Sequence, residues 1–363
     1  MKILLCVHNL TGGGAERVAS LWGNIFWAQG HEVTVLTTDR HSTITYTLPY
    51  GIKHVDIGSP SQYRLMRALY ARTLFYYQFR KAVKESKPDI IITVIPEWMK
   101  KVKISLWGLS FKLISTDHNS YERPESAPMS KHQWRTKFED QKLADMVTVL
   151  TQADKDFIGS RLRKVCVLPN PLTFTPAESV PEKEKIVLAV GRLDAWHVKG
   201  FDLLIKAWGQ IASQFPNWKL QIMGAGNMKS KELLMGMARK PIAQEQFEFV
   251  PYQKNPISVY QKADVFVLSS RYEGFGMVLI EAMSQGCACV ACDYKGRQRE
   301  IVTDGEDGLI CETDNVSQLA DKISVLIMDE TLKRKIQSNA ISSSKKFELN
   351  RISQRWNEIF SEL

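Results

Sequence analysis

Residues 264–283, DVFVLSSRYEGFGMVLIEAM, place a strand, a tight turn and a helix in one short stretch. The apolar run Asp264–Ser269 predicts a strand, and the glycines that follow turn the chain into a helix whose first N–H groups favour an anion. On one helix, Glu273 and Glu281 would be about 12 Å apart at a rise of 1.5 Å per residue. That is too far for an acid and a base acting on one bond, so we expect them to serve different parts of one extended ligand.

Short apolar runs alternate with helical patterns on both sides of this stretch, which predicts βαβ units on parallel sheets. The other predicted strands are 3–7, 32–37, 89–95, 111–115, 146–150, 164–168, 186–190, 218–223, 247–250 and the CACVAC segment at 287–292. The break at Pro169-Asn170-Pro171 divides the 363 residues into two such series. The fold class is therefore α/β, with two Rossmann-like domains facing a cleft. We expect the first domain at 1–170, the second at 171–345, and a last helix at 346–363 whose apolar face, with Ile352, Trp356 and Phe360, packs on another element.

Ligands of doubly wound sheets bind beyond the carboxyl ends of the strands, and two segments of the first domain lie there. Gly12, Gly13 and Gly14 open a helix, but they match neither a dinucleotide fingerprint nor a phosphate-binding P-loop. A flexible strand-to-helix turn is the alternative. His118 follows the strand predicted at 111–115, where a catalytic role competes with a structural one.

The second domain opens with Gly191-Arg192, and Lys199 stands at the start of the next helix. Two fixed cations with backbone donors suit a diphosphate bound without a divalent metal. A solvated charge pair on a loop is the alternative.

These segments together resemble the retaining glycosyltransferases of family four, which have the GT-B fold. The resemblance rests on the Glu273/Glu281 spacing, the GRL at 191–193 with Lys199-Gly200, the early GGGAER at 12–17 and the DHN at 117–119, and it covers essentially the whole chain. It is closest to bacterial enzymes that extend lipid-linked glycans, capsules or lipopolysaccharide.

The resemblance implies a catalytic set and a donor-binding set. The catalytic set is Glu273, His118, Arg192 and Lys199. The donor-binding set is Gly12, Gly13, Gly14, Gly191, Arg192, Lys199, Val250, Tyr252, Phe275, Gly276, Met277, Val278 and Glu281. Arg192 and Lys199 would hold the donor diphosphate, Glu281 the ribose hydroxyls and Glu273 the transferred sugar. The last helix, 346–363, would cross back onto the first domain.

The same resemblance implies the substrates and the route of reaction. The donor is expected to be a nucleoside-diphosphate sugar with uridine as the base, carrying a hexose or N-acetylhexosamine, and no metal or other cofactor is expected. The acceptor is expected to be a glycan or lipid-linked glycan bound mainly by the first domain. Transfer would proceed with retention, through a same-face, oxocarbenium-like route.

The chain also departs from the family pattern. Lys199 follows Arg192 by seven residues where five is usual, so the intervening loop is longer and brings His197 toward the site. Residues 285–289 stand where the family usually has Gly-x-Pro, and residues 295–300 replace a glycine-richer loop. We expect an altered loop beside the phosphates and an activity that is kept.

The formal net charge of +9 comes entirely from the first half of the chain. Residues 1–170 contain 24 Lys and Arg and 15 Asp and Glu, whereas the remaining residues contain 24 of each kind. Eleven of these basic residues lie at 64–112 among aromatic and aliphatic residues. Such a surface predicts peripheral contact with an anionic membrane. The alternative is that the apolar residues are core and the charges a solvated face. No nucleic acid is expected as a partner, because no nucleic-acid-binding motif accompanies the charge.

Six cysteines are few for this length and lack the spacing of a disulfide-stapled secreted module, which favours a reducing compartment. No apolar run approaches the ~18 residues of a membrane span. We therefore expect a cytoplasmic protein, peripheral on the inner face of the membrane. Two other functions stay open: a nucleotide-sugar epimerase of the same fold, and a non-catalytic scaffold derived from a transferase.

Overall fold

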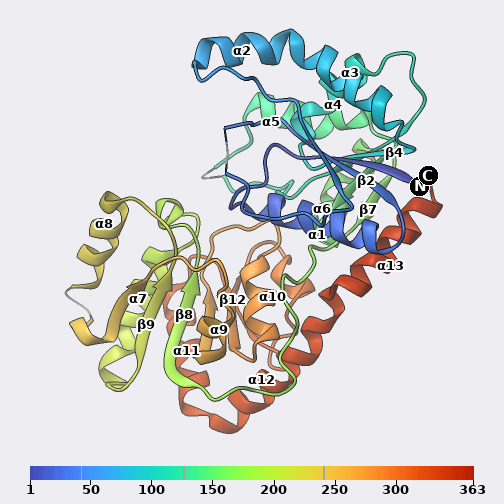
Figure 1. The fold of residues 1–363 in the computed structure, drawn as a ribbon. Helices are drawn as coiled ribbons and strands as arrows, with labels where there is room; N and C mark the ends of the chain where they lie inside the picture. The colour runs from blue at the N-terminus through green and yellow to red at the C-terminus, as the bar shows by residue number, and fades with distance from the viewer. Residues whose placement is uncertain (42, 126, 240–241) are drawn as a thin grey trace. The chain divides into compact units, whose positions relative to one another are not determined.

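A computed structural model describes residues 1–41, 43–125, 127–239 and 242–363. The chain forms two compact units (Figure 1). The first unit contains Met1–Pro171 together with Leu349–Leu363, and the second contains Leu172–Glu348. The sequence predicted boundaries after residues 170 and 345, which lie one and three residues before the observed boundaries after Pro171 and Glu348.

The first unit is built on a parallel sheet with strand order β3-β2-β1-β4-β5-β6-β7. The strands are β1 (Lys2–Cys6), β2 (Glu32–Thr37), β3 (Lys53–Asp56), β4 (Ile90–Thr93), β5 (Lys112–Thr116), β6 (Met146–Val149) and β7 (Val165–Val167). All except β3 were predicted from apolar runs. The edge strand β3 has the sequence KHVD and is partly exposed, so it carries no such run.

The helices of the first unit include one from the far end of the chain. They are α1 (Gly14–Ala28), α2 (Arg64–Arg72), α3 (Leu74–Ser86), α4 (Met99–Ser105), α5 (Lys131–Phe138), α6 (Gln152–Ile158) and α13 (Leu349–Ser361). Helix α13 lies along α1 (Figure 1), where the ring of Trp356 is 5.0 Å from that of Trp22 and 5.2 Å from that of Phe26. The predicted return of the last helix to the first domain is confirmed.

The second unit is built on a parallel sheet with strand order β10-β9-β8-β11-β12-β13, which reverses direction between β8 and β11. The strands are β8 (Glu184–Val190), β9 (Lys219–Met223), β10 (Phe247–Val250), β11 (Ala263–Leu268), β12 (Ala288–Asp293) and β13 (Leu309–Glu312). The helices are α7 (Phe201–Ile211), α8 (Met228–Ala238), α9 (Ile257–Lys262), α10 (Met277–Ser284), α11 (Val316–Met328) and α12 (Glu330–Ser344). In the described ranges, no helix is both long and apolar enough to cross a membrane.

Candidate active site

Several predicted residues of the second unit follow the ends of β8 and β11. These neighbouring strands flank the reversal of strand order, the usual ligand position in such sheets. Gly191 and Arg192 follow β8, and Lys199 stands two residues before α7. Lys199 Nζ donates to Glu273 Oε1 at 2.5 Å, so the structure brings two of the predicted catalytic residues into contact. Their side chains are 22% and 14% exposed, within reach of a ligand.

Two glycines allow Lys199 to take this position. A Cβ on Gly191 would lie 3.2 Å from Lys199 Cγ, so the lysine stem passes directly over the end of β8. Gly200 has φ +64°, and a Cβ there would lie 1.9 Å from the carbonyl oxygen of Ser269. Ser269 Oγ also donates to the Lys199 carbonyl at 2.9 Å. The end of β11 therefore determines where Lys199 stands.

Glu273 lies in the loop before α10, which corrects the assumption that both glutamates belong to one helix. Gly276, with φ +97°, caps α10, and the helix starts at Met277. A left-handed residue at this point breaks the helical path back to Glu273. Ser270 Oγ donates to Glu273 Oε1 at 2.8 Å and holds the carboxylate beside Lys199.

The helix start at α10 has the geometry expected of an anion site. The N–H groups of Met277 and Val278 are in its first turn, where a helix offers no intrahelical acceptor. Phe275 is buried, with its ring 5.4 Å from that of Phe347, so its side chain anchors the loop while its backbone is at the helix start. Backbone donors are therefore placed near Lys199 and Glu273 along the chain that leaves β11.

Glu281 is buried, at 5% exposed, and both of its carboxylate oxygens accept hydrogen bonds. Thr173 Oγ1 donates to Oε1 at 2.7 Å, and the Tyr260 hydroxyl donates to Oε2 at 2.9 Å. Such partners are what a buried carboxylate requires. Neither partner was predicted, because they lie 108 and 21 residues away in the sequence and no local pattern marks them.

The long loop between Arg192 and Lys199 is ordered by Arg271, another residue that the sequence analysis missed. Arg271 makes two hydrogen bonds of 2.8 Å to the Asp202 carboxylate and donates to the His197 carbonyl at 2.5 Å. Burial alone would raise the pKa of Asp202, but the hydrogen bonds and charge of Arg271 outweigh it and lower that pKa. The His197 side chain is exposed and lies against Trp196, so Arg271 engages His197 through its backbone.

Two of the predicted donor-binding residues, Arg192 and Tyr252, are exposed. The Arg192 side chain is exposed, and within the described residues it has no hydrogen bond or ion pair. Val250 accepts a backbone hydrogen bond from Gly224 at 3.1 Å, and Tyr252 beyond it is exposed. These positions leave a guanidinium and an aromatic ring available to a ligand.

In the first unit, the predicted glycines form the turn between β1 and α1. Gly13 is the N-cap of α1 and Gly14 its first residue. A Cβ on Gly12 would meet nothing within 4 Å, while one on Gly13 would strike the carboxylate of Glu16. The turn is therefore open to an incoming group at Gly12.

His118 follows β5 and is neutral at physiological pH. Its Nδ1 lies 3.1 Å from Asn170 Oδ1, which assigns the proton to Nδ1, and its ring packs 5.3 Å from that of Trp22. Burial lowers its pKa to about 4, despite the neighbouring Asp117. Asp117 itself forms a buried ion pair of 2.6 Å with Lys137. The pair supports the loop that carries His118.

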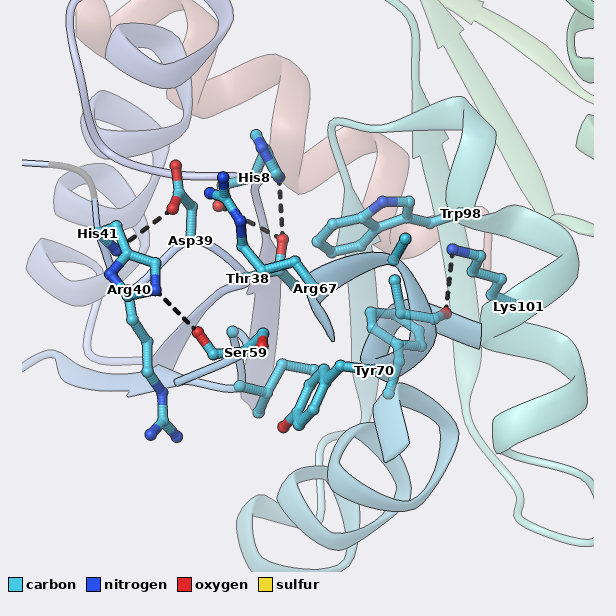
Figure 2. A pocket seen from close by; sticks show the side chains of 15 residues that line it. His8, Thr38, Asp39, Arg40, His41, Ser59, Arg67, Tyr70, Trp98 and Lys101 are labelled. Carbon is cyan, nitrogen blue, oxygen red and sulfur yellow. Dashed lines mark hydrogen bonds between the residues drawn. The ribbon is translucent and has the colours of Figure 1, made fainter. Parts of the chain in front are cut away.

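A cavity of about 390 Å³ lies in the first unit beyond the ends of β1, β2 and β3 (Figure 2). Its polar lining includes His8, Asp39, His41, Arg67 and Lys101, and Trp98 and Tyr70 contribute aromatic rings. His8 Nδ1 is 2.9 Å from Thr38 Oγ1, and His41 Nε2 is 3.1 Å from the Ser59 carbonyl. Mixed polar and aromatic lining of this kind suits a sugar. The cavity was not predicted from the sequence.

The basic segment at 63–112 divides into core and surface. Some of its apolar residues belong to the core, as the alternative to membrane contact predicted: these are Phe79, Trp98, Met99 and Leu106. Others are on the surface, since Leu65 is 80% and Trp107 is 87% exposed. Helix α2 buries none of its residues. It therefore presents apolar and basic side chains to solvent together.

Two family models match consecutive parts of the chain. The model described as "Glycosyltransferase Family 4" matches residues 12–173, and that described as "Glycosyl transferases group 1" matches residues 173–343. The chain is 28% identical to a Campylobacter jejuni α-1,4-N-acetyl-D-galactosaminyltransferase named for a diphospho-undecaprenol-linked glycan, over 100% of this chain and 99% of that one. It is also 28% identical to the amylovoran biosynthesis glycosyltransferase AmsD of Erwinia amylovora, over 99% of each.

Solved structures share the two-domain fold. The Anabaena protein HepE, in complex with UDP and glucose, is 20% identical with a TM-score of 0.82, and 100% of each chain is covered. The lipopolysaccharide outer core galactosyltransferase WaaB, in its apo form, is 22% identical with a TM-score of 0.78, again over 100% of each chain.

Proposed function

Since the chain belongs to the family 4 glycosyltransferases, the glycosyl transferases group 1, and has their GT-B fold, it is a glycosyltransferase, and we propose that it uses a UDP-linked sugar. The sugar transferred is a hexose or N-acetylhexosamine, the anomeric configuration is retained, and the acceptor is a glycan or lipid-linked glycan. The observation that carries this proposal is the contact between Lys199 and Glu273, two residues that follow the ends of β8 and β11.

Charge stabilisation is the main contribution of this site to the reaction. When the nucleoside diphosphate leaves, negative charge develops on the β-phosphate. Arg192, Lys199 and the first N–H groups of α10 offer preorganised donors for that charge without a metal ion. An arriving diphosphate competes with Glu273 for the Lys199 ammonium group. When Lys199 binds the diphosphate, the Glu273 carboxylate can accept hydrogen bonds from hydroxyls of the transferred sugar.

The first unit supplies the acceptor side of the proposal. The cavity lined by His8, Asp39 and Arg67 offers hydrogen-bonding groups to an acceptor glycan. His118 is neutral, and its Nδ1 proton is held by Asn170, so its Nε2 can only accept a hydrogen bond, and it does so without adding charge.

Membrane contact through α2 is a further part of the proposal. Leu65, Met66 and Leu69 are all more than half exposed on a helix that also carries Arg64, Arg67 and Arg72. Such a helix lies on an anionic leaflet, with about 1 kcal/mol from each well-placed cation. The chain should float with vesicles that contain phosphatidylglycerol and stay behind with phosphatidylcholine alone. Flotation that is independent of anionic lipid contradicts this part.

The experiment that tests the function is a transfer assay. Labelled UDP-sugars are incubated with the chain and with lipid extracted from the source cells, and the label is followed into the lipid phase. We expect transfer by the wild type and none by Glu273→Ala, with the configuration of the product read by NMR. Isomerised UDP-sugar without transfer supports the epimerase, and cellular function that survives Glu273→Ala supports the scaffold.

A further inference from the structure

Arg271 joins the end of β11 to the loop that leads into α7. Its Nη1 and Nη2 atoms each donate to one oxygen of the Asp202 carboxylate at 2.8 Å, which makes a two-pronged ion pair. Nη1 also donates to the His197 carbonyl at 2.5 Å, and Nε donates to Asp314 Oδ1 at 2.7 Å. Four of the five guanidinium N–H groups are thereby engaged, which fixes the plane of the side chain.

The contacts of Arg271 lie on both sides of Lys199 along the chain. The backbone N–H of Arg271 donates to the carbonyl of Val198, the residue directly before Lys199, at 2.9 Å. Asp202 follows Lys199 by one turn of chain and stands in the first turn of α7. The backbone of Lys199 is therefore held from both directions by one arginine.

The two residues before Arg271 act on the same lysine. Ser269 Oγ donates to the Lys199 carbonyl at 2.9 Å. Ser270 Oγ donates to Glu273 Oε1, the oxygen that also accepts from Lys199 Nζ. Both serines are buried. Consecutive residues beyond β11 thus determine where the lysine backbone lies and which carboxylate its ammonium group meets, and Arg271 extends these contacts into α7.

The Lys199 ammonium group depends on this support because it is a point charge on a flexible four-carbon stem. The side chains of Arg271 and Asp202 are only 15% and 9% exposed, so solvent screens their ion pair far less than a surface pair. Removing the guanidinium would leave the Asp202 carboxylate without this partner in a largely buried place. It would also release the loop that carries Lys199.

We propose that Arg271 is a positioning residue that sets Lys199 to bind the second phosphate of a nucleoside diphosphate, and so makes the chain prefer a diphosphate to a monophosphate. The inference rests on the proposed function, because that function assigns the donor diphosphate to Lys199. Arg271 acts through the lysine, since the protein itself engages most of its donor groups.

The test is titration calorimetry of the full chain in EDTA with UDP and with UMP. Arg271→Met removes the guanidinium, Lys199→Met removes the ammonium group, and a double variant combines them. Arg334→Met is the matched control, because Arg334 also pairs with a glutamate at 2.8 Å, but on the exposed face of α12. Loss of one charge-assisted contact should weaken UDP binding about tenfold in Arg271→Met and leave UMP binding nearly unchanged.

The double variant separates positioning from a general effect on structure. If Arg271 acts through Lys199, the double variant should bind UDP no more weakly than Lys199→Met alone. Arg334→Met should bind both nucleotides like the wild type. Single losses that multiply to about 100-fold in the double variant overturn the inference. Equal weakening of UDP and UMP in Arg271→Met indicates a merely structural role and overturns it too.

The remaining outcomes are also decisive. If Arg271→Met does not fold, Asp202→Asn takes its place in the same comparison, because it weakens the same ion pair from α7 and keeps the size of the side chain. A wild type that binds UDP no more tightly than UMP overturns the inference only. A wild type that binds neither nucleotide overturns the proposed UDP-linked donor and this inference with it.

Discussion

Single residues of the site were predictable, but their contacts were not. Lys199 and Glu273 stand out in the sequence because each lies beside a glycine, Lys199 at the start of a predicted helix and Glu273 just beyond a predicted strand. Their contact spans 74 residues and depends on the pairing of β8 with β11, which no local pattern reveals. Arg271 and Tyr260 went unnoticed for the same reason.

Arg192 should matter for the chemical step and not for folding. Its guanidinium is exposed and makes no ion pair in the described part of the chain, so Arg192→Ala should leave the melting temperature unchanged. Loss of one preorganised donor to the leaving group should lower kcat about 100-fold. Arg334→Ala, which removes an exposed arginine on α12, is the control and should keep full activity. Steady-state kinetics of the two variants make the comparison, and equal rates would contradict this role.

His118 should make stability depend on pH in a defined window. Burial lowers its pKa from 6.5 to about 4, so the unfolded chain takes up the proton first as the pH falls. The free energy of unfolding should therefore decrease as the pH falls from about 6.5 to about 4. Above pH 6.5 the neutral His118 makes its full contribution to stability. His118→Asn should flatten this slope in urea titrations at pH 7 and 5.

The exposed His132 supplies the control for this prediction. His132→Asn should leave the slope of the wild type unchanged. An unchanged slope in His118→Asn would mean that the imidazole titrates normally in the folded protein.

At the scale of elements, apolar runs in the sequence predicted most strands but did not predict close contacts between neighbouring backbone segments. The missed strands, β3 and β13, have four residues each, and β3 is half exposed. The turn at Gly200 has a backbone geometry that a sequence pattern alone cannot predict. A glycine between a lysine and a helix is easily noticed, but its left-handed φ and its contact with Ser269 follow from β11 lying alongside β8.

Gly200→Ala should therefore disturb both stability and the position of Lys199. A left-handed alanine costs roughly 1–2 kcal/mol, and its clash with the Ser269 carbonyl adds to that. Gly236→Ala is the matched control, because this glycine lies in α8 with nothing within 4 Å of its Cβ position. The control should raise the free energy of unfolding by about 0.5–1 kcal/mol. Chemical denaturation of both variants measures the difference, and equal effects would refute the steric argument.

At the scale of the whole molecule, two parallel sheets and a returning last helix were all predictable. The spacing of Ile352, Trp356 and Phe360 required a packing partner, and α1 provides it. The prediction could not identify α1 itself, because the pattern on a helix says only that a face is buried. Residues 346–348 were also assigned to the last helix, whereas α13 starts at Leu349.

Trp356→Ala should destabilise the first unit by about 3–5 kcal/mol, the usual cost of removing a fully buried tryptophan. Glu358→Ala, on the exposed face of α13, should cost little. Hydrogen exchange followed by mass spectrometry would locate the loss, which should appear in α1 and α13. A loss confined to residues 172–348 would contradict the packing described here.

The most direct test of the central claim is thermal unfolding with UDP, GDP, ADP and UDP-linked sugars, each with and without EDTA. A nucleotide at 100 times its dissociation constant adds about 2.7 kcal/mol to the free energy of unfolding. We expect a selective shift with UDP and its sugars, reduced in Arg192→Ala. No shift with any nucleoside diphosphate, or a shift that EDTA abolishes, would contradict a metal-independent nucleotide-sugar transferase.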